Sequence, residues 1–493
     1  MAFSAVAVDL GATSGRVLVG EVAGGRLEVN EVARFANGGV RLLDALHWDV
    51  LGIYAHVLAG LREAARVSAP TSLGIDSWAV DFGLLAADGR LLGNPLHYRD
   101  SRFANTVADV HARVPPEELY RRTGIQHLAF NTVFQLAAAA RRGELDAAAQ
   151  LLLIPDLLAY WLTGERAAEE TNASTTALLG VDGRWDTALC DRLDLPAQIL
   201  PRLEAPGAVR GPLVSRVSTE TGLPAACAVT TVASHDTASA VVAVPAASER
   251  FAYISSGTWS LVGLELPCAV VTEESRSANF TNERGIDGTV RFLRNVAGFY
   301  LIEECRRVWA RQGVTTAVDD LVGRAARLPP RRSLIDVDDP GLLVGDVPAA
   351  VAAACRKAAE PVPQSPAEVT RCLLDSIAAA YARTIAEACA LSGRAVDVVH
   401  LVGGGARNDL LAQATADACD LPVVTGPVEA AAIGNLLVQA RAHGALGPDR
   451  EDLRRHVAAV TPTRLYRPDP TEAVRWRAAR ERGGAPRPGR ALR

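Results

Sequence analysis

The stretch that decides the fold is residues 4–22, SAVAVDLGATSGRVLVGEV. Two apolar runs, 4–10 and 16–22, flank a short polar connection with two glycines, which predicts a β-hairpin. A third run, 26–32, continues it as an antiparallel meander. Residues 251–255 and 259–264 repeat the arrangement around Ser256-Gly257-Thr258. The chain therefore begins the same supersecondary unit twice.

Helical patterns alternate with buried strands after each hairpin, as in a helix predicted at 50–66 and a strand at 72–76. This alternation predicts an α/β fold. The length of 493 residues favours more than one domain. The pattern is interrupted at 244–249, around Pro245. We expect one domain over 1–246, a second over 247–466, and an Arg/Pro/Gly-rich, partly disordered tail over 467–493.

The composition favours a small-molecule partner. The net charge of -5 provides no basic surface for nucleic acid or for an anionic membrane. The N-terminus lacks signal-peptide features, and the weakly polar stretch 223–248 carries His235 and Asp236, which argues against a membrane span. The eight cysteines have no paired spacing and are expected to be reduced. We expect a cytoplasmic monomer or homodimer.

The connection at residues 9–16 has the features of a phosphate-binding turn. Its two glycines admit a close backbone approach, its hydroxyls can donate hydrogen bonds, and Arg16 can neutralise phosphate charge. Asp9 closes the preceding strand, where a carboxylate could hold Mg²⁺ directly or through water. An ordinary hairpin turn would also favour glycine and serine, so this turn alone leaves both interpretations open.

Two further elements strengthen the phosphate hypothesis. Residues 255–260 form another small, hydroxyl-rich turn at the matching place in the second half. A predicted strand at 398–402 runs through Gly403-Gly404-Gly405 towards a helix, a junction that admits a nucleotide near a helix N-terminus. Lys357 is the only lysine and is followed by alanine, which excludes a Walker loop and a protein-kinase site.

Asp236 is the best candidate for a catalytic base. It lies in Val232-Ala233-Ser234-His235-Asp236-Thr237, where an apolar strand gives way to polar and then small residues. Phosphoryl transfer to a hydroxyl needs one well-placed carboxylate to take the proton. The competing interpretation is that His235 and Asp236 only cap the next helix.

Other polar islands are weaker candidates. Asp76, Trp78 and Asp81 suit a carbohydrate, because aromatic faces stack on sugars and carboxylates accept from hydroxyls, but the composition alone is more typical of a core tryptophan with acidic neighbours. The charged segment 97–102 is typical of a solvated loop. Asn295 is expected to open a helix at about 296–309.

Taken in order over residues 6–444, these motifs resemble the FGGY family of carbohydrate kinases. The resemblance implies two ribonuclease-H-like domains of the actin and Hsp70 ATPase type, facing a central cleft that takes ATP, Mg²⁺ and a ketose. Segments 9–16, 75–82, 97–102, 234–237 and 294–295 are most similar to members that phosphorylate L-rhamnulose at its C1 hydroxyl in rhamnose catabolism.

The resemblance also implies roles for individual residues. Asp236 would accept the proton, and His235, Thr237 and Asn295 would contact the sugar. Ala79 stands where a glycine normally meets the substrate, and Glu303 where a glutamine normally faces the nucleotide. Asp9 would bind the metal, and Asp76 and Trp78 would also contact the sugar. The nucleotide would be held by Ala12, Thr13, Ser14, Gly15, Arg16, Thr258, Gly403 and Gly404.

Three alternatives stay open on the sequence alone. A kinase for another ketose, such as L-fuculose or L-xylulose, is the nearest, because Ala79 departs from the family pattern. An actin- or Hsp70-like ATPase would use the same fold without a sugar. A sugar sensor that has lost catalysis would bind ketose without phosphorylating it, but the intact Asp236 argues against this.

Overall fold

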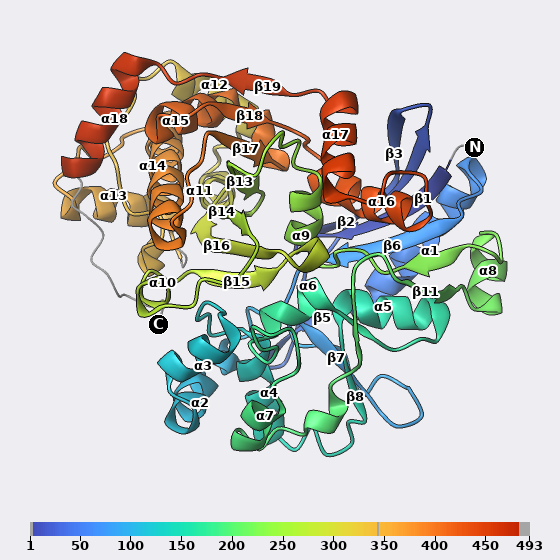
Figure 1. The fold of residues 1–493 in the computed structure, drawn as a ribbon. Coiled ribbons are helices and arrows are strands. Elements are labelled where there is room, and N and C mark those ends of the chain that lie inside the picture. Colours follow the sequence, from blue (N-terminus) through green and yellow to red (C-terminus); the bar gives the residue numbers. More distant parts are fainter. Residues whose placement is uncertain (1–2, 343–344, 483–493) are drawn as a thin grey trace.

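A six-stranded sheet in the order β11-β12-β6-β1-β2-β3 forms the centre of the N-terminal half. The computed structural model describes residues 3–342 and 345–482 (Figure 1). β1 pairs antiparallel with β2 and parallel with β6, which places the ends of β1 and β6 side by side. The strands are β1 (Phe3–Leu10), β2 (Ser14–Ala23), β3 (Arg26–Ala36), β6 (Ser72–Ser77), β11 (Val209–Pro212) and β12 (Ala228–Thr230).

A seven-stranded sheet in the order β15-β16-β14-β13-β17-β18-β19 forms the centre of the C-terminal half. Here β13 pairs antiparallel with β14 and parallel with β17, as β1 does with β2 and β6. The strands are β13 (Phe251–Ser256), β14 (Trp259–Leu266), β15 (Thr281–Arg284), β16 (Val290–Ala297), β17 (Val398–Val402), β18 (Val423–Thr425) and β19 (Arg464–Tyr466). The predicted duplication of the hairpin unit and the α/β class are confirmed.

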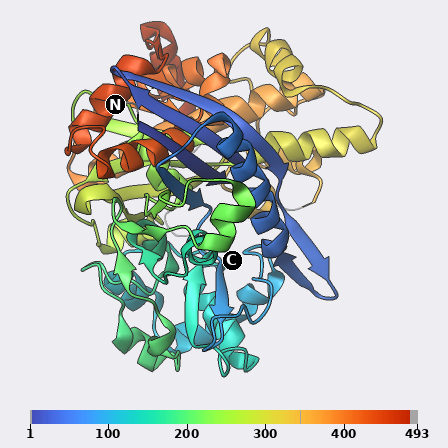
Figure 2. The same cartoon turned by 90° about the vertical axis from the view of Figure 1, so that its right-hand side faces the viewer.

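Helices pack on both sheets. On the N-terminal sheet, α1 lies against β2 and β3, as the turned view shows (Figure 2). On the C-terminal sheet, the 27-residue α14 packs against β14 and β16 with mostly buried residues. The helices of these layers are α1 (Val50–Val67), α5 (Ile154–Thr163), α8 (Ser215–Thr221), α11 (Tyr300–Arg311), α12 (Val318–Ala326), α13 (Val347–Lys357), α14 (Pro366–Ser392), α15 (Asp409–Cys419) and α17 (Arg450–Val460).

Two helices join the halves. α9 (Asp236–Val242) packs against α16 (Ala430–Ala442), and α16 in turn lies on β1 and β6 (Figure 1). The approach is so close that a Cβ at Gly434 would lie 1.7 Å from the carbonyl oxygen of Ser239. Only glycine fits there. The end of α9 that carries Asp236 is thereby fixed against both halves.

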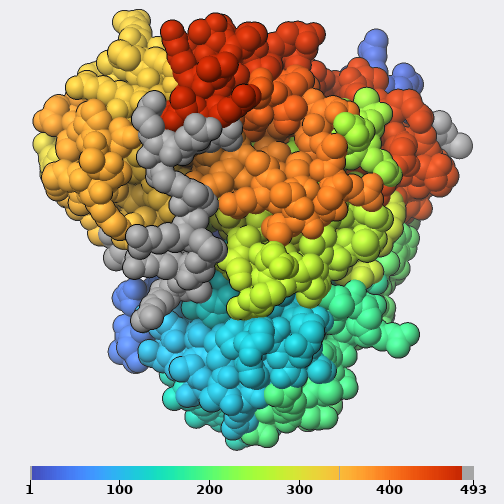
Figure 3. All heavy atoms as spheres, turned by 60° about the vertical axis from the view of Figure 1, so that its left-hand side comes forward, coloured from blue at the N-terminus to red at the C-terminus, as the bar shows by residue number. Residues whose placement is uncertain are grey.

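A smaller lobe extends the N-terminal half. It has its own apolar core, including Phe134, Leu151 and Leu178, and lies at the bottom of the molecule (Figures 1 and 3). Its elements and the remaining short ones are β4 (Gly39–Leu42), β5 (Ala45–Trp48), β7 (Phe82–Leu85), β8 (Gln150–Leu153), β9 (Ala168–Glu169), β10 (Leu203–Glu204), α2 (Val107–Arg113), α3 (Pro116–Thr123), α4 (Thr132–Arg141), α6 (Glu170–Ala173), α7 (Thr187–Arg192) and α10 (Glu273–Ser277).

One local prediction differs from the structure, and the predicted tail begins with a helix. Asn295 does not open a helix: it lies inside β16, opposite Leu261, and the helix begins at Tyr300 after Gly298. The tail predicted from 467 contains α18 (Pro470–Arg482), whose Trp476 is buried, with the Arg331 guanidinium over its ring. One buried indole is enough to dock this Arg-rich helix. Residues 483–493 of the predicted tail lie outside the described residues.

Two further features bear on the environment of the chain. Across residues 3–342 and 345–482, no helix has the length and apolar character needed to cross a membrane. Of the eight cysteines, five are buried, two are partly buried and Cys268 is exposed.

Candidate active site

A cleft of about 2030 Å³ lies between the two halves and collects most of the predicted site residues. Both hairpin turns, the triple-glycine turn and the start of α9 open into it. The predicted residues that line it are Asp9, Ala12, Thr13, Ser14, Arg16, Trp78, Ala79, His235, Asp236, Thr237, Thr258, Asn295, Gly403 and Gly404.

Three predicted residues do not line the cleft. Gly15 lies beneath the turn, where a Cβ would meet the ring of Phe35 at 2.3 Å. Asp76 is fully buried, and its Oδ2 accepts a hydrogen bond from Asn435 at 2.7 Å, so its carboxylate faces the interior and not a sugar. The carboxylate of Glu303 pairs with Arg306 at 2.7 Å, one helical turn along α11.

The first turn is strongly charged. Arg16 forms ion pairs with Asp9 and with Glu429, which comes directly before α16. Asp9 is 4% exposed, and burial raises the pKa of its carboxyl, although the Arg16 guanidinium opposes the rise. Gly11 donates its N–H to the carbonyl of Ser14 at 2.9 Å and closes the turn. A cation held between two carboxylates at a backbone turn is suited to a polyphosphate with its metal.

The second turn carries hydroxyls and no charge. The Oγ of Ser260 and the hydroxyl of Tyr381, on α14, lie 2.6 Å apart. The triple-glycine turn packs directly on this hairpin: Gly403 has a φ of 81°, and a Cβ there would lie 2.8 Å from the carbonyl oxygen of Ser256. The glycine at this position is thus required twice, by its backbone conformation and by the close approach.

Asp236 stands where α9 begins. His235 precedes the helix and makes no side-chain capping hydrogen bond, so helix capping does not account for its side chain. The Asp236 side chain is 32% exposed to the cleft, and its Oδ1 accepts a hydrogen bond from the Thr237 hydroxyl at 3.1 Å. The carbonyl of Ser234 accepts from the N–H of Ser77 at 2.8 Å, which ties this segment to the end of β6.

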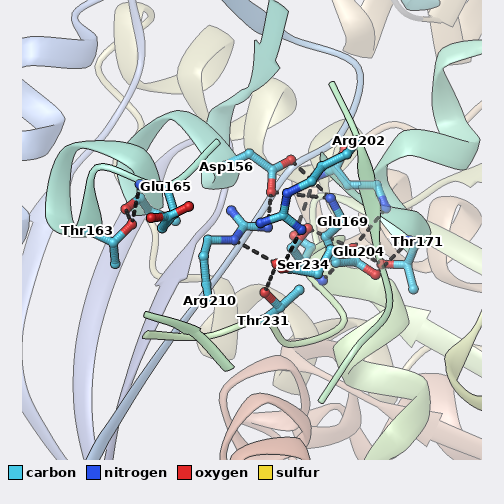
Figure 4. A network of polar contacts seen from close by, with 12 residues as sticks. Asp156, Thr163, Glu165, Glu169, Thr171, Arg202, Glu204, Arg210, Thr231 and Ser234 are labelled. Atoms are coloured by element: carbon cyan, nitrogen blue, oxygen red, sulfur yellow. Dashed lines mark hydrogen bonds and ion pairs between the residues drawn. The ribbon is translucent and has the colours of Figure 1, made fainter. Parts of the chain in front are cut away.

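A buried polar network supports this segment from below (Figure 4). The carboxylate of Glu169, which is fully buried, accepts from the N–H of Ser234 at 2.9 Å and from its hydroxyl at 2.7 Å. Beside it, Arg210 pairs with Asp156 at 2.9 Å and with Glu204 at 2.8 Å. Burial raises the pKa of Asp156 to about 6 against the pull of Arg210, and it raises the pKa of Glu169. The backbone that leads to Asp236 is therefore held by buried, hydrogen-bonded carboxylates.

Aromatic rings form another wall, and Asp81 organises it. Trp78 stacks on Trp48 with centroids 4.0 Å apart, and the indole N–H groups of Trp48 and Trp78 donate to Asp81 at 2.6 and 3.0 Å. Burial raises the pKa of Asp81 to about 7, although these donors and Gln135 lower it. Only 6% of Trp78 is exposed. The acidic residues of this island thus hold the pocket wall rather than project into the cleft.

The charged segment 97–102 is ordered, in contrast to the expected solvated loop. His97 stacks on Trp48 with centroids 4.0 Å apart, and Asp100 is 6% exposed and accepts from the N–H of Leu46 at 2.7 Å. The Arg99 guanidinium lies over the rings of Tyr98 and of Tyr300, from the other half. This arginine therefore links the two halves.

Several polar residues around the cleft escaped the sequence analysis. Gln126 accepts from the Asn295 amide at 3.1 Å across the two halves. Glu169, Glu429 and Tyr381 support the site from elements remote in sequence. No local pattern marks them, although a glutamate at the start of the apolar segment 430–440 is a weak signal for Glu429.

Comparison with known proteins decides the family. Residues 4–243 match the N-terminal domain of the FGGY family of carbohydrate kinases, and residues 252–443 match its C-terminal domain. The chain belongs to this FGGY family. The kinase is 40% identical over 478 residues to a protein named rhamnulokinase from Bacteroides thetaiotaomicron, covering 96% of this chain and 97% of that one.

Two further similarities agree. A rhamnulokinase of Enterococcus faecalis is 38% identical over 475 residues, covering 95% of each chain. Among solved structures, a gluconate kinase from Lactobacillus acidophilus superposes with a TM-score of 0.80 at 17% identity, covering 98% of this chain and 96% of that one. The structural match confirms the two-domain fold with its ribonuclease-H-like, actin-type architecture.

Proposed function

We propose that this carbohydrate kinase transfers the γ-phosphoryl group of ATP to the C1 hydroxyl of L-rhamnulose, which yields L-rhamnulose 1-phosphate and ADP at the entry to rhamnose catabolism. The observation that carries the proposal is Asp236 in one cleft with two phosphate-type turns. Its choice of sugar is supported by relatives named rhamnulokinase that match nearly the whole chain at 38–40% identity. ATP is the co-substrate that such kinases use.

The transfer needs positioned donors and one base. Arg16 neutralises phosphate charge, and the hydroxyls of Thr13 and Thr258 donate to phosphate oxygens from opposite turns. The C1 oxygen bonds to the γ-phosphorus while its proton passes to Asp236. The bond from the γ-phosphorus to the bridging oxygen breaks, and its electron pair stays on ADP. Water is excluded when the halves close on the sugar.

Asp9 is the residue that we propose for Mg²⁺. Its carboxylate lines the cleft and is paired with Arg16. Carboxylate oxygens are the type of ligand that Mg²⁺ prefers. Among the described residues, no group of three or more His, Cys, Asp or Glu side chains could hold a metal, which fits an ion bound mainly by nucleotide phosphates. When bound, Mg²⁺ neutralises charge on those phosphates.

The other assignments belong to the same proposal. His235, Thr237, Asn295, Trp78 and Ala79 face the sugar, and the turn at 12–16 with Gly403 and Gly404 faces the nucleotide. Asp76 is buried and Glu303 is paired with Arg306, so neither residue faces a ligand directly in this arrangement. We also propose the division of the chain at 246 and 247 and a cytoplasmic enzyme, monomeric or homodimeric.

A ketose panel tests the proposal. Purified enzyme is incubated with Mg·ATP and, separately, L-rhamnulose, L-fuculose, L-xylulose or no sugar, and ADP formation is followed by a coupled assay. We expect the highest kcat/KM with L-rhamnulose and little ATP hydrolysis without sugar. A higher kcat/KM for another ketose would reassign the substrate, and equal ATP turnover without any sugar would overturn the kinase proposal.

A further inference from the structure

A buried ion pair of the C-terminal half lies directly behind the proposed base. Glu283 on β15 and Arg291 on β16 face each other across the strands, and the Arg291 Nη2 lies 3.0 Å from Oε2 of Glu283. Arg291 is fully buried and Glu283 is 6% exposed. Neither belongs to the groups proposed above for nucleotide, metal or sugar. A buried charge pair is costly to desolvate and gives weak support to stability by itself, so its position requires another explanation.

The pair is aimed at His235. The same Nη2 of Arg291 donates to Nδ1 of His235 at 2.9 Å, and Arg291 is held in place by its Nε, which donates to the carbonyl of Arg284 at 3.0 Å. Oε2 of Glu283 also lies 3.2 Å from Nδ1 of His235. Burial raises the pKa of Glu283, but the Arg291 guanidinium opposes this, and the pKa lies below its usual value, so the carboxylate is charged.

These contacts fix where the imidazole carries its proton. A guanidinium has donors and no acceptor, so Nδ1 accepts in its hydrogen bond with Arg291. Oε2 of Glu283 lies 3.2 Å from the same nitrogen but makes no hydrogen bond with it. With Nδ1 as an acceptor, the ring proton of His235 lies on Nε2. Nε2 lies 3.4 Å from Oδ1 of Asp236, a distance that tightens readily when substrate binds.

The arrangement also decides which oxygen of the base is used. Both polar contacts of the Asp236 carboxylate, from Nε2 of His235 and from the hydroxyl of Thr237, end at Oδ1. Because both contacts are made to Oδ1, they orient the Asp236 carboxylate and leave Oδ2 to receive the proton.

We propose that Glu283 and Arg291 are positioning residues for phosphoryl transfer: Arg291, held by Glu283, fixes His235 in its Nε2-protonated form, and His235 orients Asp236 so that Oδ2 faces the sugar hydroxyl. This inference rests on the proposed kinase function. It adds a dependence between the halves, because strands of the C-terminal sheet set the geometry of a base on the N-terminal side of the cleft.

Nitrogen NMR tests the tautomer without any turnover. The enzyme is labelled with 15N in the rings of its nine histidines, and the signals that vanish in His235→Gln identify His235. We expect its Nε2 to carry the proton and its Nδ1 to be bare. A proton on Nδ1 in the wild-type enzyme would overturn the inference, whether or not the protein phosphorylates rhamnulose.

Kinetics tests the positioning role. We expect Arg291→Met to lower kcat about 100-fold with little change in KM for ATP, and Arg291→Lys, which keeps a donor near Nδ1, to recover about tenfold of that loss. Glu283→Gln keeps the shape of the side chain without its charge and should fall between wild type and Arg291→Met. If folded Arg291→Met keeps a kcat within about twofold of an active wild type, the inference is wrong.

A matched control separates positioning from stability. Arg371 and Asp375 form another buried pair in the same half, 2.9 Å apart, and neither lines the cleft. Asp375→Asn should lower the unfolding midpoint and leave kcat unchanged. Should Arg291→Met fail to fold, by circular dichroism, Glu283→Gln and the wild-type tautomer decide the matter. An inactive wild type would instead contradict the proposed function.

Discussion

The two hairpin turns share one topology but differ in chemistry. In the N-terminal half, the turn after β1 carries Asp9 and Arg16 and faces Glu429. In the C-terminal half, the turn after β13 carries only hydroxyls and backbone, backed by Tyr381 and the triple glycine. The difference teaches that the two copies of a duplicated frame can take different roles. We propose that the N-terminal turn and the nearby Asp236 supply charge and the base, and that the C-terminal turn supplies an uncharged, close-fitting surface for the nucleotide. We call these two turns, with the residues that support them, the charged wall and the neutral wall.

The walls also differ in what supports them. The charged wall rests on buried carboxylates, Asp81, Glu169 and Asp156, each held by several hydrogen bonds or by an arginine. The neutral wall rests on an extended apolar core that includes Tyr381, whose hydroxyl lies 2.6 Å from the Oγ of Ser260. Changes on the charged wall should therefore affect chemistry and pH response more than changes on the neutral wall.

The largest effect is expected for the base of the charged wall. Asp236→Asn keeps the size of the side chain but removes its ability to take a proton, so kcat should fall by about 10²- to 10⁴-fold while sugar KM changes little. Steady-state kinetics with L-rhamnulose measures both. Asp397→Asn, which alters an exposed pair with Arg250, is the control and should behave as wild type. Near-normal turnover of Asp236→Asn would remove this residue from its role.

A smaller loss is expected at the charged turn. Arg16→Ala removes the cation that faces the phosphates and its ion pairs with Asp9 and Glu429, so kcat/KM for ATP should fall about 10- to 100-fold. Arg16→Lys keeps a charge without the planar fork and should lose less. An Arg16→Ala enzyme with wild-type kcat/KM for ATP would place the phosphates elsewhere.

The support of the charged wall should give a pH signature. The pKa of Asp81 is raised from 3.8 to about 7, so the folded state holds its proton more tightly than the unfolded state. Its contribution to stability is complete below pH 3.8 and is lost as pH rises through about 7. In Asp81→Asn, the urea midpoint should decline less between pH 5 and pH 7 than in wild type, by about 1 M or less. An unchanged slope would contradict this account.

The smallest effect is expected on the neutral wall. Tyr381→Phe removes one hydroxyl and leaves Ser260 without its 2.6 Å partner, which should cost about 1 kcal/mol of unfolding free energy. Because the hydroxyl lies behind the turn, KM for ATP should rise less than about fivefold. Urea unfolding and ATP kinetics measure the two values. A loss of activity as large as that of Arg16→Ala would remove the distinction between the walls.

The sequence predicted the parts of both walls that are local in the chain. Alternating apolar residues and glycines marked both hairpins, and Asp236 stood out because polar residues end an apolar strand. Support from distant residues was beyond reach: Glu429 lies 413 positions from Arg16, Tyr381 lies 121 from Ser260, and Glu169 lies 65 from Ser234. Tertiary folding within each half brings the last two pairs together, and the packing of the two halves brings Glu429 to Arg16.

Two misreadings have the same physical origin. Asn295 has the composition of a helix cap, but the strand continues because β14 offers a paired edge as far as Ala297. Asp76 was predicted to contact the sugar, but Asn435 donates to its carboxylate inside the protein, as two indoles do to the carboxylate of Asp81. Tertiary partners overrode local chemistry in both cases.

The position of the phosphate on the product tests the central claim most directly. Enzyme, Mg·ATP and L-rhamnulose are incubated to completion, and phosphorus–proton correlation NMR identifies the carbon that bears the phosphate. The account predicts a single product, phosphorylated at C1, that forms in the wild type and not at a comparable rate in Asp236→Asn. Phosphate at another carbon, or the release of inorganic phosphate alone, would contradict the convergence of the two turns and Asp236 on one transfer.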